Sequence, residues 1–368
     1  MLVVLRADAS IEIGTGHVMR CLTLADELKR QGHQCLFICR EHEGHLGELI
    51  VSKGYELYLL PASRSSKEQS SERAKNPHAD WLGVSWQQDA EQTLEVLSAV
   101  EADWLVVDHY ALDARWERQV VATVGQILVI DDLADRDHEC SLLLDQNLGR
   151  VASDYDQRVP AHCVRLIGPE YVLLRPEFAR LRQRSLKRRQ QPQLKSILIS
   201  LGGIDKTNVT GQVLRAIAES SLPSEIKLDI IMGAASPHLE EVRDQAQRLR
   251  FSVTVSVNVS DMAERMCEAD LSIGAAGSTS WERCCLGLPA IVVVLADNQR
   301  LAAQALKEED VAIIVDSGES VRTVLDRMMT DGSLTTSLAS MARAGSELVD
   351  GMGCNRVVSE LTGRSAGF

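Results

Sequence analysis

The stretch MLVVLRADASIEIGTGHVMRCLTLADEL, residues 1–28, predicts a strand, a turn and a helix in succession. Met1 to Leu5 is a continuous apolar run, typical of a buried strand, and an amphipathic helical pattern begins near His17. The turn contains Gly14 and Gly16, which let a ligand approach the backbone and the N–H groups of the helix start. A histidine at that point is placed for acid–base chemistry near neutral pH. The alternative is a plain helix start with His17 on the surface.

Apolar runs alternate with helical patterns along the rest of the chain. Continuous apolar runs between helices are typical of parallel strands covered on both faces. The runs are 2–5, 35–39, 57–60, 104–107, 127–130 and 164–167 in the first half, and 196–201, 228–231, 253–257, 271–273, 291–295 and 312–315 in the second. We therefore predict an α/β fold of two Rossmann-like, doubly wound parallel-sheet domains. Ligands of such sheets bind beyond the carboxyl ends of the strands.

A basic stretch lies between the two halves. Residues 181–194 are rich in Lys and Arg, contain Pro192 and have few apolar residues. A phosphate or nucleic-acid site is one interpretation, but such a run is more typical of a solvated linker. We place the domain boundary there, with domains 1–185 and 186–368. A second polar stretch, Ser63–Pro77, is predicted to be a surface loop.

Composition and charge limit the classes of function. Of 368 residues, 45% are hydrophobic and 25% charged, which is typical of a globular protein long enough for two domains. The formal net charge of -13 disfavours non-specific binding of nucleic acid or an anionic membrane. We expect no membrane span, and no signal peptide because Arg6 and Asp8 interrupt the N-terminal apolar run. Nine cysteines without CxxC spacing favour reduced thiols and a cytoplasmic protein.

The glycine turns do not match a cofactor fingerprint. Gly14 and Gly16 satisfy the first two positions of GxGxxG, but the third falls on Met19, and no Gly-Lys-Ser/Thr follows. The sequence also lacks HExxH and the clustered His/Cys spacings of zinc sites. We therefore expect no cofactor and no metal. A second turn, at Gly202 and Gly203, suits either close packing against a ligand or a plain turn.

Residues 273–282, IGAAGSTSWE, indicate an anion site. A strand runs into four small residues, and Ser278 and Thr279 follow at a helix start. Exposed backbone N–H groups, the helix dipole and the hydroxyls together suit a pyrophosphate. Glu282 either caps the helix or accepts hydrogen bonds from the two hydroxyls of a ribose. A capped helix after a tight turn is the alternative for the whole segment.

Two short polar segments lie at the ends of predicted strands, VDHY at 107–110 and ADNQ at 296–299. The first should lie at a sheet edge that faces a ligand, although a structural hydrogen-bonding cluster is equally consistent with it. In the second, Asn298 and Gln299 either contact sugar hydroxyls or cap a loop. Asp131 and Asp132, which end another strand, are interpreted as turn residues.

Together these motifs resemble the UDP-sugar hydrolases of pseudaminic acid biosynthesis. The resemblance rests on residues 6–10, 13–17, 20–22, 107–110, 202–203, 274–282 and 296–299, which occur in the same order and span nearly the whole chain. It implies a GT-B architecture, similar to the lipid II glucosaminyltransferase, in which two Rossmann-like domains face each other across a cleft. Residues 1–185 would then carry the catalytic base, and residues 186–368 would bind UDP.

The implied reaction hydrolyses UDP-2,4-diacetamido-2,4,6-trideoxy-beta-L-altropyranose to UDP and the free sugar. UDP is a good leaving group whose negative charge needs stabilisation, which backbone N–H groups at Gly277–Thr279 could supply. One general base is then enough to activate water, and His17 fits that role. Attack by water from the opposite face would invert the anomeric carbon. Asp8 is a plausible partner that orients His17.

The resemblance also implies which residues bind substrate. Tyr110 and Asn298 correspond to sugar contacts, Glu282 corresponds to the ribose ligand, and the uracil pocket is expected near Met262. The other predicted binding residues are Asp8, Gly14, Gly16, Gly202, Gly203, Gly277, Ser278, Thr279 and Gln299. The substrate is expected to be a small UDP-sugar, with no nucleic acid and no stable membrane association. We expect a monomer, because the cleft within one chain completes the site.

Two other functions stay open. A glycosyltransferase on the same scaffold would pass the sugar to an acceptor hydroxyl, although the polar loop 63–77 favours a soluble substrate. A non-catalytic nucleotide-sugar-binding protein would keep residues 274–282 but would not need His17. Release of free sugar without an acceptor discriminates between these functions.

Overall fold

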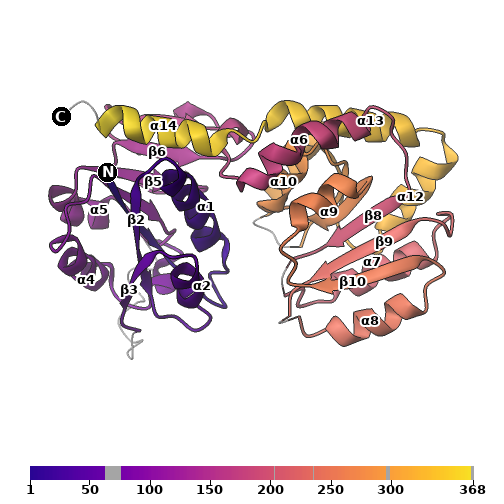
Figure 1. Cartoon of the computed structure of the whole chain (residues 1–368), viewed down its shortest axis with the longest axis horizontal. Coiled ribbons are helices and arrows are strands. Elements are labelled where there is room, and N and C mark those ends of the chain that lie inside the picture. Colours follow the sequence, from indigo (N-terminus) through magenta and orange to yellow (C-terminus); the bar gives the residue numbers. More distant parts are fainter. Residues whose placement is uncertain (63–75, 203, 235, 296–298, 366–368) are drawn as a thin grey trace. The chain divides into compact units, whose positions relative to one another are not determined.

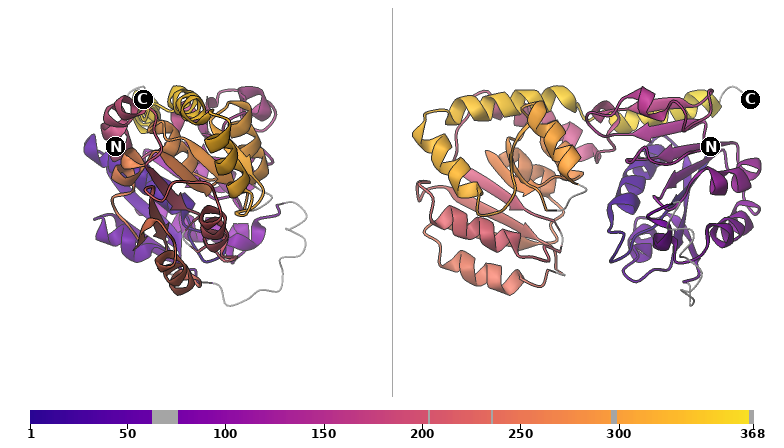
Figure 2. Two further views of the ribbon diagram at one scale, coloured as in Figure 1. Left: turned by 90° about the vertical axis from the view of Figure 1, so that its right-hand side faces the viewer. Right: turned by 180° about the vertical axis from the view of Figure 1, so that it is seen from behind.

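Parallel strands form two separate sheets, each within its own unit of the chain (Figure 1). The computed structural model describes residues 1–62, 76–202, 204–234, 236–295 and 299–365. The first unit comprises Met1–Leu173 together with the C-terminal segment from Met352, and the second comprises Leu174–Gly351. Further views show helices stacked against the strands of each sheet (Figure 2). The predicted α/β class with two Rossmann-like parallel-sheet domains is confirmed.

The first sheet has seven parallel strands in the order β3-β2-β1-β4-β5-β6-β7. These are β1 (Leu2–Ala7), β2 (Gln34–Arg40), β3 (Glu56–Leu60), β4 (Trp104–Asp108), β5 (Gln126–Ile130), β6 (Leu142–Asp145) and β7 (Val164–Ile167). Six of them match the predicted runs. The remaining strand, β6, has four residues, and the sequence analysis did not predict it.

Side chains of the first sheet alternate between two helical layers. The layer that we call the α1 face packs Val3, Leu5 and Ala7 of β1 against α1 and α14. The layer that we call the α4 face packs Val4 against α4 and α5. Among the described residues of this unit, the α-helices are α1 (Gly16–Arg30), α2 (Gly47–Ser52), α4 (Trp86–Leu97), α5 (Ala114–Val120) and α14 (Gly353–Ser365). Because successive strand residues point to opposite faces, neighbouring residues at a strand end enter different layers.

The C-terminal helix α14 is part of the first unit. Its Val357, Val358 and Leu361 are buried in the core of the α1 face, and the indole of Trp104 donates to the carbonyl of Leu361 at 3.1 Å. The predicted division had assigned residues 186–368 to one domain, whereas the chain returns to the first unit at Met352. Apolar periodicity shows that a helix has a buried side, but it does not show which sheet that side covers.

The second sheet has six parallel strands in the order β10-β9-β8-β11-β12-β13. They are β8 (Ser196–Ser200), β9 (Lys227–Met232), β10 (Ser252–Val257), β11 (Leu271–Ala275), β12 (Ala290–Val293) and β13 (Ala312–Val315), and each matches a predicted run. The helices are α6 (Pro176–Arg189), α7 (Val209–Ala218), α8 (Leu239–Gln247), α9 (Met262–Glu268), α10 (Thr279–Cys285), α11 (Arg300–Glu308), α12 (Val321–Thr330) and α13 (Leu334–Leu348). Within the described residues, no helix is long and apolar enough to cross a membrane.

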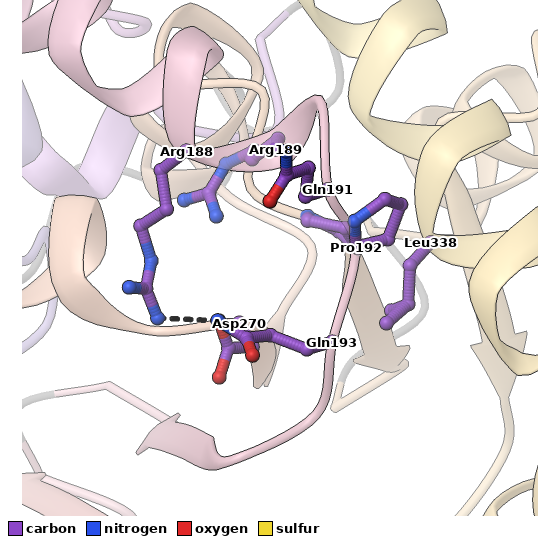
Figure 3. Close-up of a pocket in the computed structure, with 8 residues that line it drawn as sticks. Arg188, Arg189, Gln191, Pro192, Gln193, Asp270 and Leu338 are labelled. Atoms are coloured by element: carbon purple, nitrogen blue, oxygen red, sulfur yellow. Dashed lines mark hydrogen bonds and ion pairs between the residues drawn. The ribbon is translucent and has the colours of Figure 1, made fainter.

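Of the basic stretch 181–194, predicted as a solvated linker, residues 181–189 instead belong to α6, so the linker prediction was wrong for that part. Arg182 donates to the carbonyls of Cys285, Ser346 and Val349, which lie at the ends of α10 and α13. Figure 3 shows Arg188 paired with Asp270 beside the same helix. Arg182 thus satisfies carbonyls that helix ends leave unpaired, and Arg188 pairs with a carboxylate, so the run of charge packs α6 against its neighbours in the second unit.

Candidate active site

The turn between β1 and α1 brings His17 to the carboxyl edge of the first sheet. β4 lies next to β1 and its last residue, Asp108, is in register with Ala7. His17 lies in the first turn of α1 and is 7% exposed. On β4, Trp104 and Val106 point to the α1 face, so alternation directs Asp108 toward the same helix. The fold therefore places a carboxylate beside the imidazole.

Asp108, rather than Asp8, is the partner of His17. Nδ1 of His17 lies 2.6 Å from Oδ1 of Asp108, and Arg20 donates to both oxygens of that carboxylate at 2.6 Å. Burial favours a higher pKa for Asp108, but the charges of Arg20 and His17 outweigh it and lower the pKa well below its usual range. An ionised carboxylate only accepts hydrogen bonds, so Nδ1 of His17 carries the proton. The lone pair of the imidazole is then on Nε2, where it can accept a proton.

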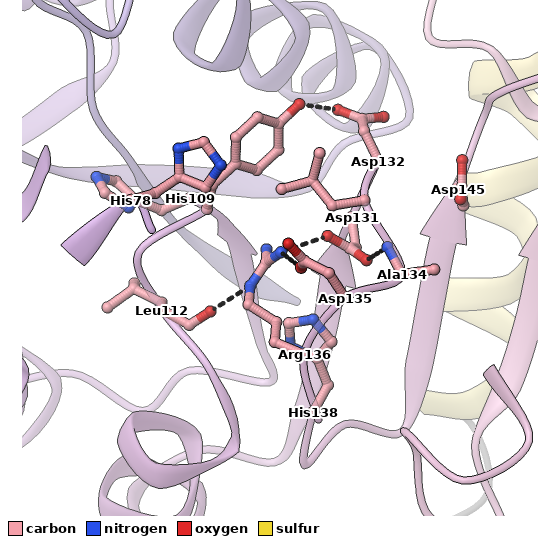
Figure 4. A network of polar contacts seen from close by, with 12 residues as sticks. His78, His109, Leu112, Asp131, Asp132, Ala134, Asp135, Arg136, His138 and Asp145 are labelled. Carbon is pink, nitrogen blue, oxygen red and sulfur yellow. Dashed lines mark hydrogen bonds and ion pairs between the residues drawn. The ribbon is translucent and has the colours of Figure 1, made fainter. Parts of the chain in front are cut away.

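A second carboxylate extends this network. Arg20 donates to Oδ2 of Asp132 at 2.7 Å, and the hydroxyl of Tyr110 donates to the same oxygen at 2.6 Å. Figure 4 shows Asp132 beside Asp131, which forms an ion pair with Arg136 at 2.9 Å. The interpretation of Asp132 as a turn residue was therefore incomplete, because it joins Tyr110 to Arg20.

Aromatic rings surround His17. The ring of Tyr110 lies edge-on to the imidazole, with 4.6 Å between centroids and 87° between planes. The indole of Trp81 is also edge-on to His17 at 6.3 Å, and it stacks on Tyr110 at 5.7 Å. His78 contacts both Trp81 and Tyr110. The sequence reading missed Trp81, because one aromatic residue just past a polar loop carries no periodic signal.

Asp8 belongs to a different network, which corrects the hypothesis that it orients His17. It accepts hydrogen bonds from both terminal nitrogens of Arg6, at 2.6 and 2.9 Å, and from the backbone N–H of Arg40 at 2.7 Å. Asp89 of α4 pairs with Arg6 and Arg40 in turn. Burial favours a higher pKa for Asp8, but Arg6 lowers it well below its usual value. Ala7 points to the α1 face. The next residue, Asp8, therefore points to the α4 face, where its side chain is fully buried.

The two predicted glycines of the first turn have different roles. Gly14 has a φ of +82°, which favours glycine, and its backbone forms a bridge with Ser10 across the turn. Gly16 starts α1 without such a conformation. A Cβ at either position would meet no atom within 4 Å. Both glycines therefore border open space next to His17.

In the second unit, the predicted anion loop follows β11 and leads into α10. Gly277 and Ser278 are exposed and Thr279 is half-buried. Ser278 is the N-cap residue of α10, but its hydroxyl makes no capping hydrogen bond. A Cβ on Gly277 would meet nothing within 4 Å, whereas one on Gly274 would collide with Nη1 of Arg283. Gly274 is thus required by packing, and Gly277 leaves the loop open.

Glu282 lies one turn into α10 and contacts Arg175. The distance from Nη2 of Arg175 to Oε1 of Glu282 is 3.4 Å, and the same arginine pairs with Glu177 at 3.1 Å. Burial raises the pKa of Glu282, against the opposing charge of Arg175. The carboxylate that the resemblance assigns to a ribose therefore forms its ion pair with a partly exposed arginine, and Arg283 also acts on its charge.

Three other predicted residues lie after a strand or at a helix start in the second unit. Gly202 has a φ of +98° at the end of β8, and Met262 is the first residue of α9. The side-chain oxygen of Gln299 accepts from the backbone N–H of Leu295 at 3.1 Å, so it closes the start of α11. Gly203 and Asn298 lie outside the described residues. Among the residues that the structure describes, no group of three or more His, Cys, Asp or Glu is arranged to hold a metal ion.

Comparisons with known proteins connect this geometry to sugar chemistry. Residues 200–352 match the glycosyltransferase family 28 C-terminal domain. The chain is 26% identical over 310 residues to the UDP-2,4-diacetamido-2,4,6-trideoxy-beta-L-altropyranose hydrolase of Campylobacter jejuni, covering 84% of this chain and 97% of the relative. The resemblance predicted from the sequence motifs is therefore confirmed.

Two further relatives cover almost the whole chain. The spore coat polysaccharide biosynthesis protein SpsG of Bacillus subtilis is 25% identical over 362 residues, 96% of each chain. The crystal structure of Acinetobacter baumannii MurG superposes with a TM-score of 0.70 at 15% identity, covering 98% of this chain and 99% of MurG. This structural likeness shows the fold, and it confirms the predicted GT-B class.

Proposed function

We propose that the chain hydrolyses UDP-2,4-diacetamido-2,4,6-trideoxy-beta-L-altropyranose to UDP and 2,4-diacetamido-2,4,6-trideoxy-L-altropyranose, in pseudaminic acid biosynthesis. Similarity to the Campylobacter jejuni hydrolase supports this substrate. The observation that carries the chemistry is the 2.6 Å contact between Nδ1 of His17 and Asp108. It fixes the tautomer in which Nε2 can act as a general base.

In this proposal His17 activates water. Nε2 takes a proton while the water oxygen forms a bond to the anomeric carbon. The bond from that carbon to the β-phosphate oxygen breaks, and its electron pair leaves with UDP. Attack opposite the leaving group inverts the anomeric configuration. Asp108 stabilises the imidazolium that forms, and Arg20 holds Asp108 in place through two 2.6 Å contacts.

The rings around His17 suit a sugar ligand. Tyr110 and Trp81 present apolar surface beside a base, and Tyr110 is anchored through its hydroxyl to Asp132. A 6-deoxy sugar has a methyl group where ordinary hexoses have a hydroxymethyl group, so it gains from an apolar wall. We assign Tyr110 and Asn298 to sugar binding and add Trp81, because its indole stacks on the ring of Tyr110.

The second unit is assigned to UDP. Gly277, Ser278 and Thr279 offer backbone N–H groups and hydroxyls to the diphosphate, and Glu282 offers a carboxylate to the ribose. Gly202, Gly203 and Gln299 complete the predicted binding turns. The charge that develops on the departing UDP needs hydrogen-bond donors rather than an acid, because a diphosphate is already a good leaving group. We expect the enzyme to act as a monomer in the cytoplasm, without metal or cofactor.

The test is proton NMR of the purified chain with this UDP-sugar and no acceptor. We expect UDP and free sugar, with the first-formed anomer inverted. The His17→Asn variant should bind UDP with unchanged affinity. It should release free sugar much more slowly than the wild type. Intact substrate after incubation with the wild-type chain would overturn the proposal, and near-normal turnover by His17→Asn would remove His17 as the base.

A glycosyltransferase is the second candidate, because the C-terminal match is to a transferase family. In that reaction His17 would deprotonate an acceptor hydroxyl instead of water. The same NMR experiment separates the two functions, since a transferase leaves the UDP-sugar intact until an acceptor is added.

A further inference from the structure

Two arginines of the second unit, the buried Arg283 and the half-buried Arg189, have no carboxylate as an ion-pair partner. Arg283 and Arg189 both donate only to neutral oxygens, and no described residue forms an ion pair with either of them. Burial lowers the pKa of each guanidinium to about 10. A buried charge is costly unless something compensates it, so each arginine needs a separate explanation.

Arg189 is explained by the fold itself. Its three nitrogens donate to the carbonyls of Met266, Ala269 and Leu286 at 2.9 Å. These carbonyls lie at the carboxyl ends of α9 and α10, where unpaired C=O groups create partial negative charge. The helix ends therefore compensate the charge of Arg189.

Arg283 has the opposite surroundings. Its Nη2 donates to the carbonyl of Ala275 and to the hydroxyl of Ser280, both at 2.8 Å, so the guanidinium lies inside the turn formed by residues 274–280. Gly274 is packed so closely that a Cβ there would collide with Nη1. The residue is 3% exposed. No described residue forms an ion pair with this cation. The carboxylate of Glu282 acts on it only at longer range and is itself paired with Arg175. The open loop around Arg283 is the one assigned to a diphosphate.

We propose that Arg283 supplies a buried positive charge for the UDP diphosphate and positions the loop 274–280 that binds it. This inference rests on the proposed function of that loop. The ligand adds an anion close to a guanidinium that has no ion-pair partner, while the bonds to Ala275 and Ser280 hold the loop in place. A side chain that cannot reach solvent loses little rotamer freedom when the ligand binds. Arg283 is thus a positioning residue that acts beneath the loop.

The test compares the binding of UDP and uridine by calorimetry, supported by ligand-observed NMR for the weaker ligand. Uridine shares the base and ribose but has no phosphate. Arg283→Gln keeps a side-chain donor and removes the charge, and Arg283→Met removes both while it retains apolar packing. Arg283→Lys restores the charge. Arg189→Gln is the matched control, because it removes a half-buried charge that also lacks an ion pair and that contacts the carboxyl end of α10.

We expect Arg283→Gln and Arg283→Met to weaken UDP binding about tenfold or more, since unit charges within a protein still interact strongly at several ångströms. Uridine binding should change by less than about twofold, and Arg283→Lys should recover most of the UDP affinity. Arg189→Gln should bind both ligands as the wild type does. The dependence of UDP affinity on salt should become weaker only in the Gln and Met variants of Arg283.

Two results would overturn the inference. One is UDP affinity that stays at the wild-type value in Arg283→Gln. The other is a loss of uridine and UDP affinity in equal proportion, which would reduce Arg283 to a packing role. If the wild-type chain itself binds no UDP, the proposed function fails first, so the two failures are distinguishable.

Discussion

The two faces of the first sheet carry similar residues with different exposure. On the α1 face, His17, Asp108 and Arg20 form a network in which the Arg20 side chain is 14% exposed and that of Asp132 is 16% exposed. On the α4 face, Arg6, Asp8, Asp89 and Arg40 pair with one another and are all fully buried. Asp8 of the second network also contacts His42, whose side chain is 16% exposed, but the four paired side chains themselves are shielded from solvent. We therefore propose that the ion pairs serve chemistry on the α1 face and stability on the α4 face.

Loss of the base should have the largest effect. His17→Asn removes Nε2 and should lower kcat for release of UDP from the diacetamido sugar about 10³-fold, within the range of general base catalysis. The measurement is steady-state UDP release, with calorimetry to show that UDP affinity is unchanged. If kcat of His17→Asn stayed within tenfold of the wild-type value, the difference in catalytic role between the α1 face and the α4 face would be contradicted.

A substitution in the network on the α4 face should instead lower the stability of the folded chain. Asp89 accepts hydrogen bonds from Arg6, Arg40 and the indole of Trp116, and Asp89→Asn leaves these guanidinium groups with too little negative charge. We expect the free energy of unfolding to fall by about 3–5 kcal/mol, measured by urea denaturation. The kcat of the folded fraction should equal that of the wild type. A lowered kcat without loss of stability would contradict the division between the faces.

Asp108→Asn sharpens the comparison, because it alters the carboxylate that positions the proposed base without removing the histidine. The amide can donate to Nδ1 and so favour the wrong tautomer of His17. We expect kcat to fall about 10²-fold while UDP affinity is kept. Arg20 retains Asp132 as a partner, so the free energy of unfolding should fall less in Asp108→Asn than in Asp89→Asn. Equal kcat values for Asp108→Asn and the wild type would show that the 2.6 Å contact has no catalytic role.

The smallest expected effect concerns Asp145, another carboxylate on the α4 face. Burial raises its pKa from 3.8 to about 6, with Asp132 adding to the shift and Asn147, Tyr155 and Arg150 opposing it. Between these two values the folded chain binds more protons than the unfolded chain, so stability falls as pH rises from about 4 through 6. The loss should be on the order of 2 kcal/mol.

The measurement is urea unfolding of the wild type and Asp145→Asn at several pH values. Buried carboxylates with lowered pKa values, such as Asp8 and Asp89, are present in both proteins and contribute the opposite trend. The difference between the two curves therefore isolates Asp145. Parallel curves between pH 4 and 6 would contradict the predicted titration.

The sequence predicted most of the secondary structure and the places where polar residues gather. Twelve of the thirteen strands lie on apolar runs, because a buried parallel strand must be apolar along its length. His17 at the start of α1 and the small residues after β11 were also visible, since a turn and a helix start are local features. The sequence reading failed at α6, where a basic run suggested solvent but the arginines cap other helices.

Only the tertiary structure decided which polar residues act together. The order β2-β1-β4 brings the end of β4 beside α1, and the alternation of side chains sends Asp108 to His17 and Asp8 to the opposite layer. Asp8 and Asp108 look alike in the sequence, as do Arg189 and Arg283. Local periodicity encodes elements because it needs only neighbouring residues. Partners, by contrast, depend on strand order, side-chain parity and the direction of nearby helix ends, which are set when the whole chain packs.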